Sequence, residues 1–262
     1  MTMLAGKQLL VGNSILGRLP IQDLIEMRPF LQRVVLEQRM VLQEPRRPSE
    51  HVHFVESGLI SMRTVAAGNI LETATVGRWG AVGVSALLGT HVPIHQSVVL
   101  FSGSALRIHV DDLRRLVGER PQLREHSLKY VQSLIFQTAQ MALCCVHHGR
   151  QERLAAWLCL ACDAVDGNVL PVTHDQLSVI LGLRRAGVTE ALIEFNQQGL
   201  VRKTRGVLEI ANRQELGRLA CGCYETLTRE YYSKPQFGRV TTPSHDAHVV
   251  VPHATRNGPP SN

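Results

Sequence analysis

The stretch that decides the fold is Thr173–Gln198, which reads THDQLSVILGLRRAGVTEALIEFNQQ. It opens with a capping box, in which Thr173 and Gln176 can each satisfy a free backbone N–H of a first helical turn. Gly182 supplies the positive φ that ends a helix. The pattern therefore predicts a short helix up to Gly182 and a second helix from about Arg184 to Gln198.

The second predicted helix has one apolar side and one polar side. Val188, Leu192 and Phe195 recur at helical spacing and form a stripe for burial. Two short helices joined by a glycine-centred turn are typical of a helix-turn-helix, whose second helix enters the major groove of DNA. Two arginines begin that helix, and arginine can bind guanine through two hydrogen bonds. The outward residues are Arg184, Arg185, Gly187, Thr189 and Glu190.

A polar hairpin is predicted directly after these helices. Residues 200–210 read as two short strands around an Arg205-Gly206 turn, with three cations near the tip. Such a hairpin is the wing of a winged helix-turn-helix, whose cations meet DNA phosphates and so give affinity, while base contacts give sequence choice. A helical hairpin that happens to end in a basic turn is the alternative. The predicted DNA-binding residues are Thr173, Gln176, Arg184, Arg185, Gly187, Thr189, Glu190, Arg202, Lys203 and Arg205.

The first half of the chain has a different pattern. After a helical lead-in, residues 33–110 contain short runs rich in β-branched and apolar residues, such as Val52–Val55 and Leu59–Val65. Glycines and prolines, Gly58 among them, separate these runs at intervals of roughly 8 to 12 residues, which predicts an antiparallel sandwich or barrel. We expect no parallel βαβ units because no helical segment lies between the strands.

A long helix follows the predicted β structure. Asp111 or Asp112 is expected to cap a short helix, and Pro121 suits the first turn of the next one. From there to about His148 the sequence has no further Gly or Pro, and apolar residues repeat at alternating spacings of 3 and 4. This heptad seam indicates a dimer helix, although a single buried core helix is the other interpretation. The seam residues are Leu128, Val131, Ile135, Thr138 and Ala142.

The composition is that of a globular protein with an aliphatic core. The chain has 262 residues, of which 44% are hydrophobic and 5% aromatic, and its formal net charge is +6. That total is a weak indication of a polyanionic partner, so the local basic face carries more weight. No apolar run reaches the roughly 18 residues that span a bilayer. Residues 1–12 lack the features of a signal peptide, so we expect a cytoplasmic protein with no membrane partner.

Six cysteines lie in segments that are predicted to be helical. In a reducing cytosol we expect them to be buried small apolar residues rather than disulfides. Cys159 and Cys162 form a C-x-x-C, but no second pair of ligands accompanies it, so no metal site is predicted. The other four are Cys144, Cys145, Cys221 and Cys223.

The order of these parts resembles the Crp/Fnr family of bacterial regulators over about residues 13–232. The stretches that carry the resemblance are HFVESGLIS (53–61), VGRWGAVG (76–83), RLAAWL (153–158) and RRAGVTEAL (184–192). The resemblance implies an α+β fold with an N-terminal β-roll or jelly-roll barrel. Its implied domains are a cyclic-nucleotide-binding-like barrel (13–120), a dimerisation helix (121–149) and a winged helix-turn-helix (150–232), before a disordered tail (233–262).

The resemblance also bears on effectors and cofactors. Members that bind cAMP hold it with a Gly-Glu pair and an Arg-Ser pair, where this chain has Gly80-Ala81 and Gln96-Ser97. Both charged residues are missing, so we expect no tight cAMP binding. Members with an iron–sulfur cluster need cysteines near the N-terminus, and the first here is Cys144, so no such cluster or other cofactor is expected. The implied effector pocket comprises Gly80, Ala81, Val82, Gly83, Gln96 and Ser97.

A metal- or small-molecule-binding jelly-roll of the cupin type is the competing hypothesis. His51 and His53 alternate on a predicted strand, and Glu56 follows, although this spacing is shorter than the cupin pattern. His91, His95 and His109 come later in the chain and could supply the further, distant histidine. No enzyme is predicted, because no Ser or Cys sits in a recognisable nucleophile elbow. The resemblance instead implies a homodimeric transcription factor that reads a palindromic operator in double-stranded DNA. Its further partner would be RNA polymerase, and an unidentified effector in the barrel would control it.

Overall fold

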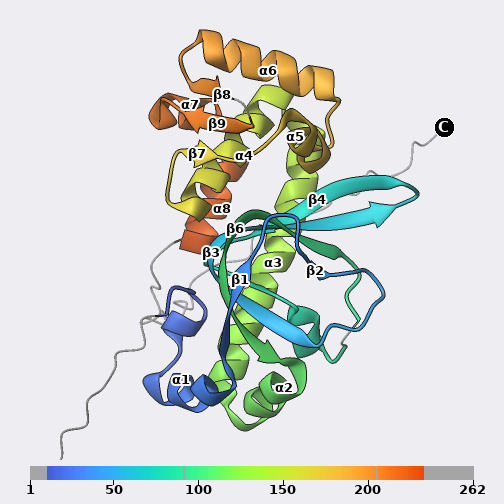
Figure 1. The fold of residues 1–262 in the computed structure, drawn as a ribbon, viewed down its shortest axis with the longest axis vertical. Helices are drawn as coiled ribbons and strands as arrows, with labels where there is room; N and C mark the ends of the chain where they lie inside the picture. Colours follow the sequence, from blue (N-terminus) through green and yellow to red (C-terminus); the bar gives the residue numbers. More distant parts are fainter. Residues whose placement is uncertain (1–10, 91, 205, 233–262) are drawn as a thin grey trace, which may run out of the picture. The chain divides into compact units, whose positions relative to one another are not determined.

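The computed structural model describes residues 11–90, 92–204 and 206–232. It has an N-terminal sheet, a long helix and a C-terminal helical part that contains a second, smaller sheet (Figure 1). This arrangement confirms the predicted α+β fold class. The predicted tail over residues 233–262 lies outside the described residues.

The N-terminal sheet is built from strands that pair in an antiparallel manner throughout. Its central path runs β1-β6-β3-β4, while β2 pairs with β6 and β5 pairs with β3. A short 3-10 helix, η3 (Val84–Leu88), lies between β5 and β6, where the sequence predicted no helix. The strands are β1 (Gln32–Leu36), β2 (Val41–Gln43), β3 (His51–Ala66), β4 (Asn69–Val76), β5 (Ala81–Val82) and β6 (Gln96–His109).

Strand β3 corrects one expectation from the sequence. Gly58 was expected to separate two strands, but it lies inside a single strand whose register shifts on either side of it. Its φ is +87°, and a Cβ there would lie 2.6 Å from the carbonyl oxygen of Phe101. Glycine therefore lets the strand bend and approach β6 closely, instead of ending it.

Helices precede and follow the strands of this sheet in the sequence. The lead-in consists of η1 (Leu16–Arg18), α1 (Ile21–Met27) and η2 (Arg28–Phe30), and α2 (Val110–Glu119) follows β6. The cap of α2 differs from the prediction: His109, whose side chain accepts from the N–H of Asp111, is the N-cap, because the aspartates already lie in the first turn. Pro121 stands at the first position of α3 (Pro121–His147), as predicted.

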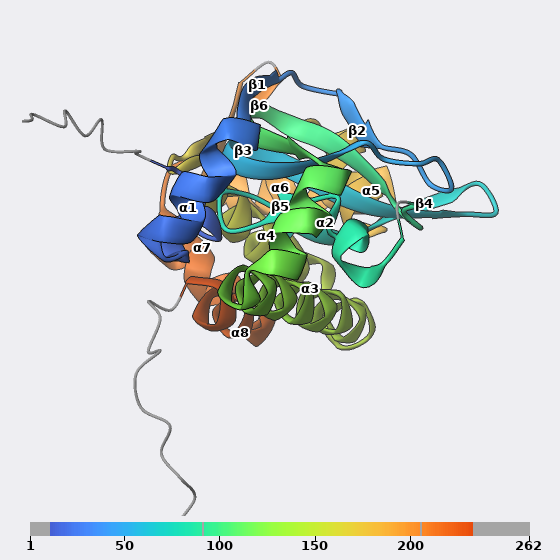
Figure 2. The ribbon, with the colours of Figure 1, turned by 90° about the horizontal axis from the view of Figure 1, so that it is seen from below.

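Helix α3 lies along the sheet and buries one side against it (Figure 2). Leu123, Tyr130 and Leu134 join the core of the sheet, and the Tyr130 hydroxyl donates to the carbonyl oxygen of Ala81 at 2.9 Å. Val131 joins the same core. Ile135 is 64% exposed, so the apolar residues predicted as one seam are divided between the two sides of the helix.

Among the described residues, the C-terminal part contains five helices and a small sheet of order β7-β9-β8. The last two described helices are separate, because Ala220 is extended at ψ 141°, and Cys221, which was expected in a helical segment, lies outside any helix. The elements are α4 (Arg150–Val165), β7 (Val169–Leu170), α5 (His174–Leu181), α6 (Arg185–Gln197), β8 (Val201–Thr204), β9 (Val207–Ile210), α7 (Arg213–Leu219) and α8 (Gly222–Tyr232).

A buried carboxyl group joins the N-terminal sheet to α4. Glu72 of β4 is 1% exposed and accepts hydrogen bonds from the Ser61 hydroxyl and, at 2.8 Å, from the Trp157 indole N–H. Burial raises the pKa of Glu72 to about 7, although these hydrogen bonds act in the opposite direction. The protonated acid is therefore the form that this junction stabilises.

This junction predicts a pH dependence of stability. The pKa of Glu72 in the folded chain, about 7, lies above the unfolded value of 4.5. Its contribution is therefore fully present below pH 4.5 and is lost as the pH rises through 7, with a total of at most about 3 kcal/mol. Glu72→Gln keeps a neutral hydrogen-bonding group, so its free energy of unfolding should fall less over this range than that of the wild type. Urea unfolding at a series of pH values measures the difference. The exposed control Glu37→Gln should follow the wild type, and identical profiles for all three proteins would contradict the assignment.

Candidate nucleic-acid interface

The predicted helix-turn-helix is formed by α5 and α6. The Thr173 hydroxyl accepts from the N–H of Gln176 at 3.2 Å, and the Gln176 side chain accepts from the N–H of Thr173 at 2.9 Å. Gly182 ends α5 in the left-handed region at φ +60°. The capping box and the glycine turn are thus confirmed, and the side chains of Thr173 and Gln176 are engaged in capping α5.

The apolar side of α6 fixes how the helix presents its other side. Val188, Leu192 and Phe195 are buried at 0%, 4% and 1% exposure, and they belong to the same core as residues of α4 and α5. A helix anchored along this stripe turns its opposite side to solvent. Arg184 and Arg185, at the start of α6, are both exposed.

Two residues on the outward side of α6 already have partners in the chain. The Glu190 carboxylate pairs with Arg150 at 2.7 Å, and the Thr189 hydroxyl lies 2.9 Å from Nδ1 of His174. Sequence reasoning did not select Arg150 or His174, because both come from other helices and only tertiary packing brings them to α6. Any base contact by Glu190 has to compete with Arg150.

Arg185 pairs with an acidic group across the turn. Its Nε lies 3.0 Å from the carboxylate of Asp175, and the two side chains are 69% and 66% exposed. An ion pair this exposed is weak, since water and salt screen it. Arg185 is therefore held over the N-terminus of α5 but can exchange this partner for another anion.

A hollow of about 270 Å³ lies between the helix-turn-helix and the wing. Arg185 of α6, Lys203 of β8 and His174 of α5 all line it. The pKa of His174 is lowered, first by burial and then by the positive charges of Lys203 and Arg185. The hollow is lined by Val172, Thr173, His174, Asp175, Leu177, Arg185, Leu192, Lys203, Thr204, Gly206, Val207 and Leu208.

The wing has the predicted hairpin form. Strands β8 and β9 pair in an antiparallel register from Val201 with Ile210 to Thr204 with Val207. Arg202 and Lys203 are exposed, and Arg202 lies 4.0 Å from the Glu209 carboxylate. Arg205, the third predicted cation, lies outside the described residues.

The residues predicted for an effector pocket form two groups. Residues 80–83 are closely packed, and residues 96–97 form hydrogen bonds within the chain. Gly80 has no room for a side chain, because a Cβ would lie 2.6 Å from the Tyr130 hydroxyl oxygen. Ala81 and Val82 are each 1% exposed, and Gly83 has a φ of +101°.

At the other end, Gln96 donates to the Glu44 carboxylate at 3.2 Å, and the buried Ser97 hydroxyl donates to Gln43 at 3.4 Å. A carboxylate beside Gln96 opposes a phosphate there.

The histidines of the competing cupin hypothesis lie close together on the sheet. The rings of His51 and His109 are 5.5 Å apart, and those of His51 and His53 are 6.3 Å apart. Glu56, however, accepts from the N–H of Gly12 and pairs with Arg33 at 2.9 Å. Within the described residues, these side chains do not converge as a set of metal ligands.

Comparison with known proteins gives a family match for the C-terminal part of the chain. Residues 152–219 match the family model of the Crp-like helix-turn-helix domain. A global nitrogen regulator of Nostoc sp. is 23% identical over 167 residues, which are 60% of this chain and 75% of that protein.

Solved structures show the same fold over most of the chain. A Crp/Fnr-family regulator from Eubacterium rectale matches with a TM-score of 0.62 at 14% identity, over 79% of this chain and 98% of that one. A Crp/Fnr-family regulator from Thermus thermophilus matches with a TM-score of 0.60 at 21% identity, over 72% and 98% of the two chains.

The fold and the two exposed arginines at the start of α6 define a winged helix-turn-helix protein with an N-terminal β-barrel. Residues 152–219 match a Crp-like helix-turn-helix domain, and the chain has the fold of the Crp/Fnr-family regulators to which it is similar. No helix among the described residues has both the length and the apolar character needed to cross a membrane.

The first turn of α6 yields a prediction about stability. Gly187 lies inside this helix, and a Cβ there would meet only the Arg150 side chain at 3.5 Å, an ordinary contact. Alanine has the higher helix propensity, so Gly187→Ala should raise the free energy of unfolding by about 0.5–1 kcal/mol, measured by urea denaturation. Gly206→Ala is the matched control and should lower it, because Gly206 has a φ of +76°. A loss of stability in Gly187→Ala would show that α6 does not have this geometry.

Proposed function

We propose that this protein is a homodimeric transcription factor of the cytoplasm that binds a palindromic operator. Helix α6 enters the major groove, and the wing contacts the flanking phosphates. The observation that carries the proposal is that Arg185 and Lys203, from different elements, face one hollow beside the exposed start of α6. The phosphate backbone of DNA is a ligand that fits such an arrangement.

Each side chain has a distinct role in this proposal. Arg184 and Arg185 read base edges or reach the nearest phosphates from the first turn of α6, where a helix meets the groove. Arg202 and Lys203 contact phosphate oxygens without reading sequence. Asp175 holds Arg185 in position in the free protein and releases it to DNA.

Dimerisation through α3 would set the spacing of the two recognition helices. Leu128 and Ile135 are 41% and 64% exposed, and Ala142 is exposed on the same helix. Thr138, which is half-buried, lies between Ile135 and Ala142 along the helix. Apolar side chains at heptad spacing on the outer side of a 27-residue helix fit a second copy of that helix.

The proposal also includes control by an effector in the barrel. The protein would contact RNA polymerase and would have no catalytic role. Gly80 and Ala81 are packed against α3, so a change in the barrel can bias the position of that helix. The effector would be a molecule other than cAMP, because Gln96 faces Glu44 and not a cation. No iron–sulfur cluster or other cofactor enters this scheme.

Arg185 is the side chain whose removal should weaken DNA binding most clearly. An operator is first selected from a random-sequence DNA library with the wild type, and affinity is then measured by fluorescence anisotropy at two salt concentrations. Arg185→Ala should weaken binding about fivefold or more, because an arginine–guanine pair is worth about 1–3 kcal/mol. Addition of cAMP should leave the wild-type affinity unchanged.

Arg218→Ala is the control, since Arg218 is 65% exposed and pairs with a nearby acid, as Arg185 does. Equal affinities for both variants, or failure to select any sequence, would count against the proposed interface.

The exposed side of α3 provides a separate test of dimerisation. Ile135→Asp places a charge in the proposed helix–helix contact, so the protein should become monomeric and bind a palindromic operator at least about tenfold more weakly. Sedimentation equilibrium gives the mass of each variant. Ile21→Asp is the control, because Ile21 is equally exposed, at 69%, on α1. A wild type that is monomeric at micromolar concentration, or an Ile135→Asp variant that stays dimeric, would refute this interface.

A further inference from the structure

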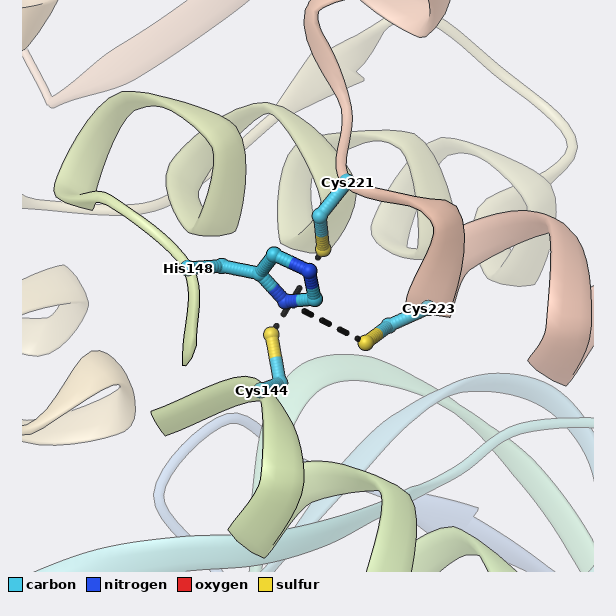
Figure 3. Close-up of side chains that lie close together, drawn as sticks. All are labelled: Cys144, His148, Cys221 and Cys223. Atoms are coloured by element: carbon cyan, nitrogen blue, oxygen red, sulfur yellow. Dashed lines mark hydrogen bonds between the residues drawn. The ribbon is translucent and has the colours of Figure 1, made fainter. Parts of the chain in front are cut away.

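Three cysteines and one histidine converge at the base of the helix-turn-helix domain (Figure 3). Two of them lie at the end of α3 or just beyond it, one lies in the turn before α8, and one lies in the first turn of α8. Their four ligand atoms all lie within 4.8 Å of one another. The residues are Cys144, His148, Cys221 and Cys223.

The spacing of these atoms is that of a tetrahedral site. The sulfurs of Cys144 and Cys221 are 3.5 Å apart, and the sulfur of Cys223 is 3.4 Å from Nδ1 of His148. Zinc–sulfur bonds of about 2.3 Å in a tetrahedron place neighbouring sulfurs about 3.8 Å apart. Small movements of the side chains therefore suffice to close the four groups around one ion.

The chemistry of the four groups selects among metals. Three thiols and one imidazole make the Cys₃His set of structural zinc sites, in which the protein supplies all four ligands. Soft thiolates favour Zn²⁺ over Ca²⁺ or Mg²⁺, which prefer oxygen. The sulfurs are also shielded from water, since Cys144, Cys221 and Cys223 are 4–6% exposed.

A neighbouring side chain supports the site from outside. The Gln140 amide donates to the sulfur of Cys223 at 3.1 Å. Hydrogen bonds of this kind orient ligating groups and tune metal sites. Cys145 differs, because its sulfur accepts from Arg153 and it is not part of the group.

We propose that Cys144, His148, Cys221 and Cys223 bind one Zn²⁺ ion. This site was not predicted from the sequence, and the proposal does not depend on DNA binding. Two ligands precede residues 152–219 and two follow them, so the ion would fasten the two ends of the helix-turn-helix domain together. Because Cys144 lies in α3 and His148 caps it, the ion would also link the start of α8 to the end of α3.

Metal content is the first measurement. The full chain is purified under reducing conditions without chelator, and its metals are determined by plasma mass spectrometry. We expect about one zinc per chain. Co²⁺ added to the metal-free protein should give the intense visible absorption of a tetrahedral site, together with sulfur-to-cobalt charge transfer.

Substitutions locate the ion. Cys221→Ser and Cys223→Ser should each lower the affinity for Zn²⁺ by at least about tenfold, as loss of a ligand or its support does. Cys145→Ser, at the position next to a proposed ligand, should keep the wild-type affinity. Retained affinity in Cys221→Ser and Cys223→Ser would overturn the proposal.

A measurement on the wild type alone covers the case in which the variants do not fold. In the native protein, a thiol reagent should leave three thiols protected by Zn²⁺ that become reactive when a chelator removes the metal. No difference between the two forms would overturn the proposal. Without reductant, a mass lower by two hydrogens and a digest peptide that joins Cys144 to Cys221 would reveal a disulfide between them. Failure of the reduced protein to bind Zn²⁺ would then overturn the zinc proposal and leave redox pairing as the role of these sulfurs.

Discussion

Helix α4 has almost no side that faces water, and the positions of the other elements depend on this constraint. Leu154 and Leu158 are fully buried and Trp157 is 3% exposed, because the N-terminal sheet, α6 and α7 all pack around the same helix. A core of this kind tolerates few changes in side-chain volume. The exception to its apolar character is Arg153, which donates to the carbonyl oxygen of Leu181. That carbonyl ends α5, so α4 directly fixes the turn between the two DNA-binding helices.

Local signals in the sequence were sufficient for the helix-turn-helix. Thr173, Gly182 and Val188 act through neighbours only a few residues away, and capping, a left-handed glycine and a 3.6-residue period are readable without a fold. Gly58 shows where such reading fails, since the same residue can end a strand or bend one. The choice depends on how closely β6 approaches, which no local pattern contains. The extended Ala220, which separates α7 from α8, is likewise not marked by a local glycine or proline signal.

The functional residues that the sequence did not reveal are all long-range partners. Arg150 meets Glu190 from another helix, and Cys144 meets Cys221 across 77 positions of the chain. Spacing rules for metal ligands assume that the ligands lie in one or two short, recognisable motifs. Here neither the Cys144–His148 pair nor the Cys221–Cys223 pair matches such a motif by itself. The region predicted as an effector pocket shows the same limit. Its residues could be located by resemblance, but the close packing of Gly80 against Tyr130 could not.

That contact between the barrel and the long helix has an evolutionary consequence. The Tyr130 hydroxyl occupies the space that any side chain at position 80 would need, and it also holds the backbone of Ala81. A residue larger than glycine at position 80 therefore requires a smaller residue at position 130, and the hydrogen bond to Ala81 is then lost. The two positions are 50 residues apart in the sequence. In related proteins they should vary as a pair, so that divergence of the barrel is recorded in the helix that leads to the helix-turn-helix domain.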